Sequence, residues 1–436
     1  MSESHETESA GSVMIYCADI TGHRHLHSAY FIRFFSDHGY TVYFCFAGRQ
    51  SRLRSRGRFI YESFESPYLE ALKGNPRVHF IDICRELNVV NNELDFILEL
   101  QRRLKPTVSL FIDGDTLKFM FLKQLLPWQK RLAGANFCIT CLSEFLYLPV
   151  GKFQALKELR LFIYFFFFKR HRFVQRIIFV EKFPLLNKLF FRCLCRFNLL
   201  TAAFCPDARL VEKIKNRRVL FLPELITGDL EGKISEKETS FYTRVKSQYQ
   251  DFLNRNRDKQ VLLMFGDLEN RKGFDLLLQL AANEPGCVCA RFGRTKGGYT
   301  SNWPAIISKE KLLVEDRLFE VDTYIESKEL VDFIFSTVRF VILPYRNYYR
   351  TSGVMIEVLR RGLPVLTPDK GVMAYIVKHH GVGGVFRDGN LTELREAFAG
   401  FKQDYIRYLK NIEKFNLIYS KENTEEILSL MLEKQK

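Results

Sequence analysis

The sequence VILPYRNYYRTSGVMIEVLRRGLPVLTPDKG, residues 341–371, carries the pattern that decides the fold. An apolar segment ends at Leu343-Pro344, and Ser352-Gly353 then stands at the predicted start of a helix. Glu357 lies one turn further into that helix. A Gly-Leu-Pro turn leads on to a short buried strand over Pro364–Thr367. Buried strands that alternate with helices in this way indicate an α/β domain with a parallel sheet.

A second strand–turn–helix unit lies earlier in the chain. Its apolar strand, VLLMFG, occupies residues 261–266, and the next helix is preceded by Arg271-Lys272-Gly273. Amides at the start of a helix and the helix dipole attract anions, and a glycine such as Gly353 lets a ligand approach the backbone. The helix start at Ser352-Gly353 therefore predicts a site for a phosphorylated ligand. A solvated basic turn is the simple interpretation of Arg271-Lys272-Gly273.

Taken in order, these residues resemble the C-terminal, donor-binding half of family-4 glycosyltransferases. The resemblance rests on Phe265-Gly266, Arg271-Lys272-Gly273, Leu343-Pro344, Ser352-Gly353, Glu357, Gly362-Leu363-Pro364-Val365, Gly371 and Gly383. It is looser in the N-terminal half of the chain. It implies the GT-B fold, in which two Rossmann-like, doubly wound α/β domains face a central cleft.

The resemblance also implies roles for single residues. Lys272, with Arg271 beside it, would contact the diphosphate of the donor. The amides at Ser352-Gly353 would take a phosphate, and Glu357 would bind the ribose. The implied reaction transfers a hexose-type sugar with retention at the anomeric carbon. Its donor is a nucleotide-sugar, which is a substrate, and the resemblance implies neither a tightly bound cofactor nor a metal.

Two residues depart from the family pattern. An arginine usually follows the strand glycine, where this chain has Asp267. A carboxylate repels a diphosphate, so either Asp267 points away or Arg271 compensates its charge. The family also has a glutamate eight residues before Glu357, where this chain has Tyr349, and a tyrosine with a pKa near 10 is not an anion at pH 7. A non-catalytic GT-B-like protein that binds nucleotide-sugars is therefore the alternative hypothesis.

The pattern of apolar residues divides the chain into five parts. We expect a disordered leader (1–12), an N-terminal acceptor-side Rossmann-like domain (13–226), a linker (227–259), a nucleotide-sugar-binding domain (260–400) and a helical tail (401–436). The first domain opens with a βαβ unit, and the linker contains a helix over about 238–254. The resemblance implies that the last helix crosses back to the first domain.

The same pattern predicts the strands of both domains. In the first domain they are Val13–Ala18, Thr41–Phe46, Val78–Ile83, Thr107–Ile112, Asn136–Leu142, Leu199–Phe204 and Val219–Leu222. In the second domain they are Val261–Phe265, Val288–Phe292, Leu318–Val321, Val338–Leu343 and Pro364–Thr367.

Loops that follow strands of the first domain supply the catalytic candidates, because ligands bind at the carboxyl ends of parallel strands. Gly22 and His23 follow the first strand, and Asp113 follows the strand over Thr107–Ile112. We predict that Asp113 orients the acceptor hydroxyl, that His23 is a second catalytic candidate and that Gly22 lies under the phosphates or the acceptor. Ordinary turns are the alternative. Histidines two apart on a helix do not share a face, so no metal site is predicted here.

Positive charge is concentrated in one part of the chain. The net charge is +15, and residues 150–220 hold 16 Lys and Arg against 4 Asp and Glu. Within a basic aromatic stretch, 152–196, the apolar run Leu161–Phe168 is far shorter than the roughly 20 residues that span a bilayer. We interpret the stretch as amphipathic helices on an anionic membrane surface, with buried helices as the alternative. No recognition motif supports nucleic acid as a partner.

Cysteine usage and the N-terminal residues indicate the compartment. Ten cysteines lie scattered without a disulfide-framework spacing, which fits a reducing cytoplasm. Cys138 and Cys141 form one isolated C-x-x-C pair, which we interpret as two buried thiols. Residues 1–12 lack the composition of a secretory signal. We therefore predict a cytoplasmic glycosyltransferase, peripheral on the inner face of the membrane, whose acceptor is lipid-linked or a surface glycan.

Overall fold

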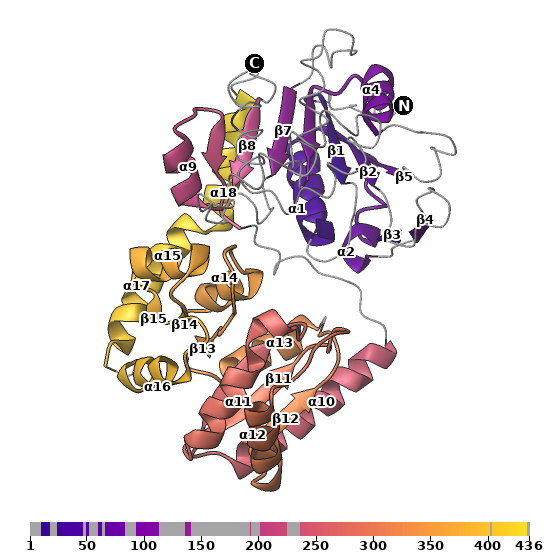
Figure 1. Cartoon of the computed structure of the whole chain (residues 1–436). Helices are drawn as coiled ribbons and strands as arrows, with labels where there is room; N and C mark the ends of the chain where they lie inside the picture. Colours follow the sequence, from indigo (N-terminus) through magenta and orange to yellow (C-terminus); the bar gives the residue numbers. More distant parts are fainter. Residues whose placement is uncertain are drawn as a thin grey trace, which may run out of the picture. The chain divides into compact units, whose positions relative to one another are not determined.

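The structure is a computed structural model. It describes residues 10–17, 24–46, 49–51, 60–62, 66–82, 93–112, 136–140, 192, 201–224, 236–325, 327–401 and 403–433. The chain divides into two compact units (Figure 1). Met1–Lys233 and Thr424–Lys436 make up the N-terminal unit, and Ile234–Asn423 make up the C-terminal unit. Each unit is built around parallel strands.

The N-terminal unit contains a seven-stranded parallel sheet in the order β5-β2-β1-β6-β7-β8-β9. Its elements are β1 (Ser12–Cys17), α1 (Arg24–Asp37), β2 (Thr41–Phe46), β3 (Arg49–Ser51), β4 (Ile60–Glu62), α2 (Pro67–Glu70), β5 (Val78–Asp82), α4 (Glu93–Leu104), β6 (Val108–Phe111), β7 (Asn136–Thr140), β8 (Ala202–Cys205), α9 (Ala208–Ile214) and β9 (Val219–Phe221). Val13 of β1 lies opposite Val42 of β2 and Val108 of β6. The strand order therefore reverses beside β1.

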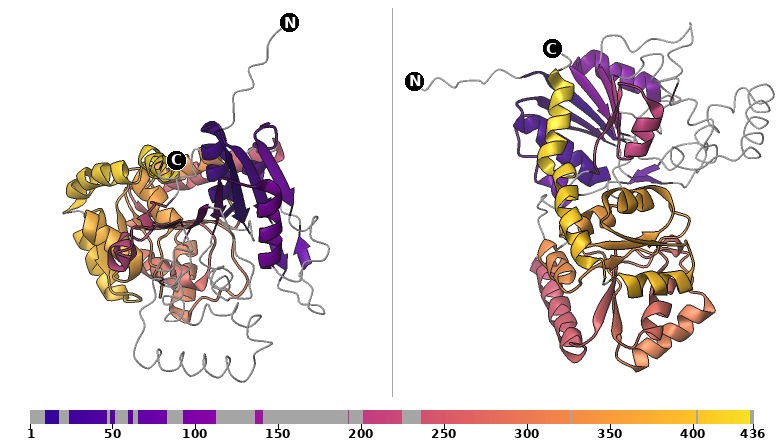
Figure 2. Two further views of the ribbon diagram at one scale, coloured as in Figure 1. Left: turned by 90° about the horizontal axis from the view of Figure 1, so that it is seen from above. Right: turned by 90° about the vertical axis from the view of Figure 1, so that its left-hand side faces the viewer.

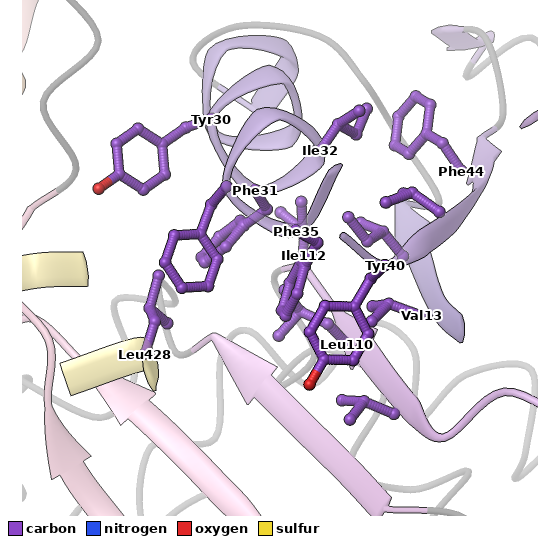
Figure 3. Packing of buried hydrophobic residues seen from close by; sticks show 14 of the residues in the cluster. Val13, Tyr30, Phe31, Ile32, Phe35, Tyr40, Phe44, Leu110, Ile112 and Leu428 are labelled. Carbon is purple, nitrogen blue, oxygen red and sulfur yellow. The ribbon is translucent and has the colours of Figure 1, made fainter. Parts of the chain in front are cut away.

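The last helix, α18 (Lys421–Glu433), belongs to the N-terminal unit from Thr424 onward. Figure 2 shows it in yellow beside the strands of that unit. Leu428 of α18 is fully buried in one cluster with Phe31 of α1 and Val13 of β1 (Figure 3). Burial of a large apolar side chain contributes about 1.5–3 kcal/mol, so these contacts hold the end of the chain on the N-terminal core.

The C-terminal unit contains two parallel ladders, β10-β11-β12 and β13-β14-β15. Its elements are α10 (Glu236–Arg255), β10 (Gln260–Phe265), the 3-10 helix η4 (Asn270–Lys272), α11 (Phe274–Asn283), β11 (Cys287–Phe292), α12 (Trp303–Val314), β12 (Leu318–Val321), α13 (Lys328–Ser336), β13 (Val341–Ile342), α14 (Gly353–Arg360), β14 (Val365–Pro368), α15 (Gly371–His380), β15 (Gly383–Phe386), α16 (Leu391–Gly400) and α17 (Tyr405–Ile418). Strand β13 lies beside β10. The strand order therefore reverses beside β10, as it does beside β1.

Each strand predicted from the sequence is present, with ends that shift by a few residues. The largest difference is at β13, which is shorter than the predicted strand over Val338–Leu343. The preceding helix takes up the first part of that apolar segment, since Thr337 caps α13 and the Val338 amide bonds to Phe335 O. Strand β15 was not predicted, because Gly383 and Gly384 resemble a turn in the sequence.

The segment expected to be a linker contains α10, which is part of the C-terminal unit. Tyr249 and Phe252 of this helix are buried, and the Tyr249 hydroxyl lies 2.9 Å from Thr337 Oγ1. A polar composition suggested a linker because only one face of α10 packs on the unit. Within the described part of the chain, none of the helices has the length and apolar composition needed to cross a lipid bilayer.

Candidate functional site

The candidate site lies where β10 and β13 end, at the point where the strand order of the C-terminal unit reverses. Open α/β sheets bind ligands at this position. The loop after β10 leads through η4 to Gly273, and the loop after β13 leads from Pro344 to α14. The two loops are in contact, since the Arg346 amide donates to Arg271 O at 2.7 Å.

Gly273 is what allows the two loops to pack so closely. Its φ of +68° lies in the left-handed region, and a Cβ at this position would lie 1.9 Å from Pro344 O. Any larger residue would therefore push the loop after β10 away from the loop after β13. This contact places Lys272, which directly precedes Gly273, beside the residues that follow Pro344.

Lys272 is a buried cation without an anionic partner in the part of the chain that the structure describes. It is 7% exposed, and its Nζ donates to the Tyr345 hydroxyl at 2.5 Å. Among the described residues, no carboxylate lies within ion-pair distance of this amine. Burial of an unpaired charge is costly, so the arrangement favours an anionic ligand that would supply the missing charge.

The start of α14 offers backbone donors to the same ligand. Ser352 is the N-cap, and its Oγ accepts from the Met355 amide at 3.4 Å. The amides of Gly353 and Val354, in the first helical turn, then have no acceptor among the described residues. A Cβ at Gly353 would meet no atom within 4 Å, so the space beside the first amide is open.

Glu357 lies on the same helix and is only partly available. Its Oε1 is paired with Nη1 of Arg361. The other terminal nitrogen of Arg361, Nη2, donates to Asp332 Oδ1 at 2.6 Å. Oε2 of Glu357 has no hydrogen-bond partner among the described residues. The side chain is 28% exposed. One carboxylate oxygen therefore remains for a ligand hydroxyl.

The two charges flagged in the sequence, Arg271 and Asp267, do not compensate each other. Arg271 donates to Glu269 at 2.7 Å and stacks over the Tyr348 ring at 5.0 Å. Asp267 accepts two hydrogen bonds from Arg294, at 3.2 and 3.0 Å. Of the two alternatives for Asp267, compensation by Arg271 is therefore not what the structure shows. Arg294, from the loop after β11, neutralises this carboxylate.

No model of a protein family and no curated protein matches the chain. Solved structures do match. Sucrose-phosphate synthase from Thermosynechococcus elongatus aligns over 97% of this chain and 98% of its own, with a TM-score of 0.57 and 13% identity. Anabaena HepE in complex with UDP and glucose aligns over 97% of this chain and 100% of its own, with a TM-score of 0.59 and 11% identity.

The chain has the GT-B fold. UDP-GlcNAc 2-epimerase from Neisseria meningitidis bound to UDP-GlcNAc also matches, over 97% of this chain and 99% of its own, with a TM-score of 0.53 and 13% identity. A synthase and an epimerase thus share the architecture, so the GT-B fold by itself does not determine the reaction. The prediction of fold class from the sequence is confirmed.

The candidates in the N-terminal GT-B unit lie outside the described residues. These are Gly22, His23 and Asp113. The strands that precede them, β1 and β6, are neighbours in the sheet, and Tyr16 of β1 lies opposite Phe111 of β6. The roles of the three residues stay predictions.

Two further predictions for the N-terminal unit concern the basic aromatic stretch and the cysteine pair. The stretch 152–196 also lies outside the described residues, apart from Arg192. Cys138 is fully buried, and burial raises the pKa of its thiol to about 12, so it is protonated at neutral pH. Cys141 lies outside the described residues. Within the part of the chain that the structure describes, no group of His, Cys, Asp and Glu is suited to a metal ion.

Sequence analysis missed two residues of the site, Tyr345 and Arg294. Tyr345 follows Leu343-Pro344 directly. In the sequence, an aromatic residue after an apolar strand is most simply interpreted as part of the hydrophobic core. Arg294 pairs with Asp267 across 27 positions of the chain. A signal for Arg294 was present, because Asp267 needed a cation and the neighbouring strand β11 ends just before Gly293-Arg294.

Proposed function

We propose that this chain is a glycosyltransferase that moves a sugar from a nucleotide-sugar to an acceptor hydroxyl. The observation that carries the proposal is the buried ammonium of Lys272. It has no carboxylate partner among the described residues and belongs to the same site as the open start of α14. A donor diphosphate would supply the negative charge that this cation lacks.

Several likenesses support a nucleotide-sugar as the ligand. Anabaena HepE was solved in complex with UDP-glucose, and the Neisseria meningitidis epimerase was solved with UDP-GlcNAc. The ordered residues from Phe265-Gly266 to Gly383 resemble family-4 glycosyltransferases. We therefore propose that this chain is of that type, with a hexose-type donor and retention at the anomeric carbon.

The chemistry of the site concerns the leaving group. When the bond from the sugar to the diphosphate breaks, negative charge develops on the diphosphate oxygen. Lys272 and the amides of Gly353 and Val354 form a preorganised set of donors for that charge, which is the usual form of electrostatic catalysis. The free oxygen of Glu357 binds a ribose hydroxyl and orients the nucleotide.

The acceptor side of the proposal rests on composition. The excess of basic residues in 150–220 fits an anionic membrane surface, and a membrane-bound enzyme would act on a lipid-linked acceptor or a surface glycan. Flotation with vesicles tests this part. We expect the full chain to float with anionic vesicles at low salt and to stay behind with neutral ones. Equal recovery with both would contradict an electrostatic membrane contact.

Calorimetry with UDP, GDP, ADP and TDP tests the donor site without knowledge of the acceptor. We expect one of the four diphosphates to bind in the micromolar range, as befits a substrate fragment. The matching nucleotide-sugars are then tested for release of the diphosphate, which a protein that only binds the donor would not produce. Failure of all four diphosphates to bind would contradict the proposed function.

A further inference from the structure

Tyr345 occupies the centre of the donor site, although sequence analysis gave it no role. It follows β13 directly and is 2% exposed. Its hydroxyl oxygen accepts a hydrogen bond from Lys272 Nζ at 2.5 Å and a second one from Ser352 Oγ at 3.3 Å. The phenol thus connects the lysine after β10 with the first residue of the α14 cap.

The Tyr345 hydroxyl accepts two hydrogen bonds but donates none to the described residues. A tyrosine hydroxyl has two acceptor sites and one proton to donate. Lys272 and Ser352 occupy both acceptor sites, and Ser352 Oγ itself accepts from the Met355 amide. Among the described residues, no acceptor receives the Tyr345 proton. A buried donor without an acceptor is destabilising, so this proton is available to a ligand.

We propose that Tyr345 is a binding residue for the diphosphate of the donor. Its hydroxyl donates to a phosphate oxygen, while its own oxygen keeps the Lys272 ammonium directed at the same anion. The inference rests on the proposed function and names one further contact of that site.

The surroundings favour a phosphate oxygen over other acceptors. Among the described residues, the open groups nearest the Tyr345 hydroxyl are donors: the Lys272 ammonium, the Gly353 and Val354 amides and the Tyr345 hydroxyl itself. The open acceptor of the site, Oε2 of Glu357, lies one helical turn further along α14. An acceptor-only group with several oxygens can satisfy this set, and a phosphate is such a group. A neutral phenol also positions the lysine without cancelling its charge, as a carboxylate would.

The test compares three variants by calorimetry, with the nucleoside diphosphate that binds the wild type. Tyr345→Phe removes only the hydroxyl, and Lys272→Met reports on the site as a whole. Tyr249→Phe is the matched control, because it removes a buried hydroxyl of the same unit that bonds to Thr337 instead. We expect Tyr345→Phe to weaken diphosphate binding about ten- to a hundredfold, as for loss of a hydrogen bond to a charged group, and Tyr249→Phe to leave it unchanged.

A second ligand separates binding from a merely structural role. The matching nucleoside, followed by ligand-observed NMR, lacks the phosphates, so Tyr345→Phe should leave its affinity unchanged. An equal loss for nucleoside and diphosphate, or no loss for either, would overturn the inference. If Lys272→Met weakens the diphosphate and Tyr345→Phe does not, the proposed function survives and the inference fails. If no diphosphate binds the wild type, both fail.

Discussion

Two clusters of charge lie at the carboxyl ends of strands in the C-terminal unit, and they differ in how the charge is balanced. Near the end of β11, Arg291 is 4% exposed and donates to Glu320 of β12 at 3.0 Å, with Asp322, which follows β12, 3.6 Å away. Between β10 and β13, Lys272 is 7% exposed, and the Tyr345 hydroxyl is its hydrogen-bond partner among the described residues. We infer that the balanced charge of Arg291 stabilises the fold and propose that the unbalanced charge of Lys272 is kept for a ligand.

The largest effect on stability is expected at the balanced cluster. Arg291→Met removes the cation that Glu320 and Asp322 share, while Lys309 still pairs with Glu320 at 2.6 Å. It should cost about 2 kcal/mol of unfolding free energy, as for loss of hydrogen bonds from a buried charged side chain. Urea unfolding checks this value. Nucleotide affinity at 25 °C should remain, because Arg291 bonds to Glu320, Gly293 and Thr295 and not to the residues of the proposed donor site. A variant as stable as the wild type would contradict the division into two clusters.

A smaller effect is expected where the site is only partly open, at Glu357. If its free oxygen binds a ribose hydroxyl, the wild type should prefer a ribonucleotide over the 2′-deoxyribonucleotide by about tenfold, equivalent to one hydrogen bond. Glu357→Gln should reduce that preference and leave the phosphate contacts in place. Competition calorimetry with the two nucleotides measures it. An undiminished preference in the variant would assign ribose binding to another residue.

The smallest effect is a dependence on pH at the balanced cluster. The Thr295 amide, which donates to Asp322 at 2.6 Å, is the main cause that lowers the pKa of this carboxyl. A lowered pKa means that the ionised form stabilises the fold above the unfolded value of about 4, and that this stabilisation is lost as the pH falls below it.

Asp322 is 56% exposed, so the contribution is below about 1 kcal/mol after solvent screening. Asp322→Asn should therefore be slightly less stable than the wild type at pH 7, and the difference should shrink as the pH falls through the lowered pKa of Asp322, as measured by urea unfolding at pH 7 and at pH 3. A difference in unfolding free energy that grows as the pH falls would contradict a stabilising role for the ionised form of Asp322.

Much of the fold could be predicted from the sequence because its strands are short, apolar and bounded by turns. Strand β2 was predicted to the residue, as was β12. Lys272 and Ser352-Gly353 were predicted because residues close in sequence form a helix start. The partner of Lys272 could not be predicted, since Tyr345 comes from a loop 73 positions away. The partner of Asp267, 27 positions away, was missed although the need of Asp267 for a cation pointed to the loop after the neighbouring strand. Glu357 is an intermediate case of predictability. Its role was predicted without its ion-pair partner, although Arg361, four residues further along the same helix, could have been anticipated.

The most direct test of the account uses Lys272→Met, measured for both ligand affinity and stability. Methionine keeps the length of the buried stem and removes the unbalanced charge. We predict that affinity for the nucleoside diphosphate falls at least about a hundredfold, as for loss of a charge-assisted contact, while the melting temperature stays the same or rises. A variant that loses stability and keeps its nucleotide affinity would contradict the claim that Lys272 is reserved for the donor.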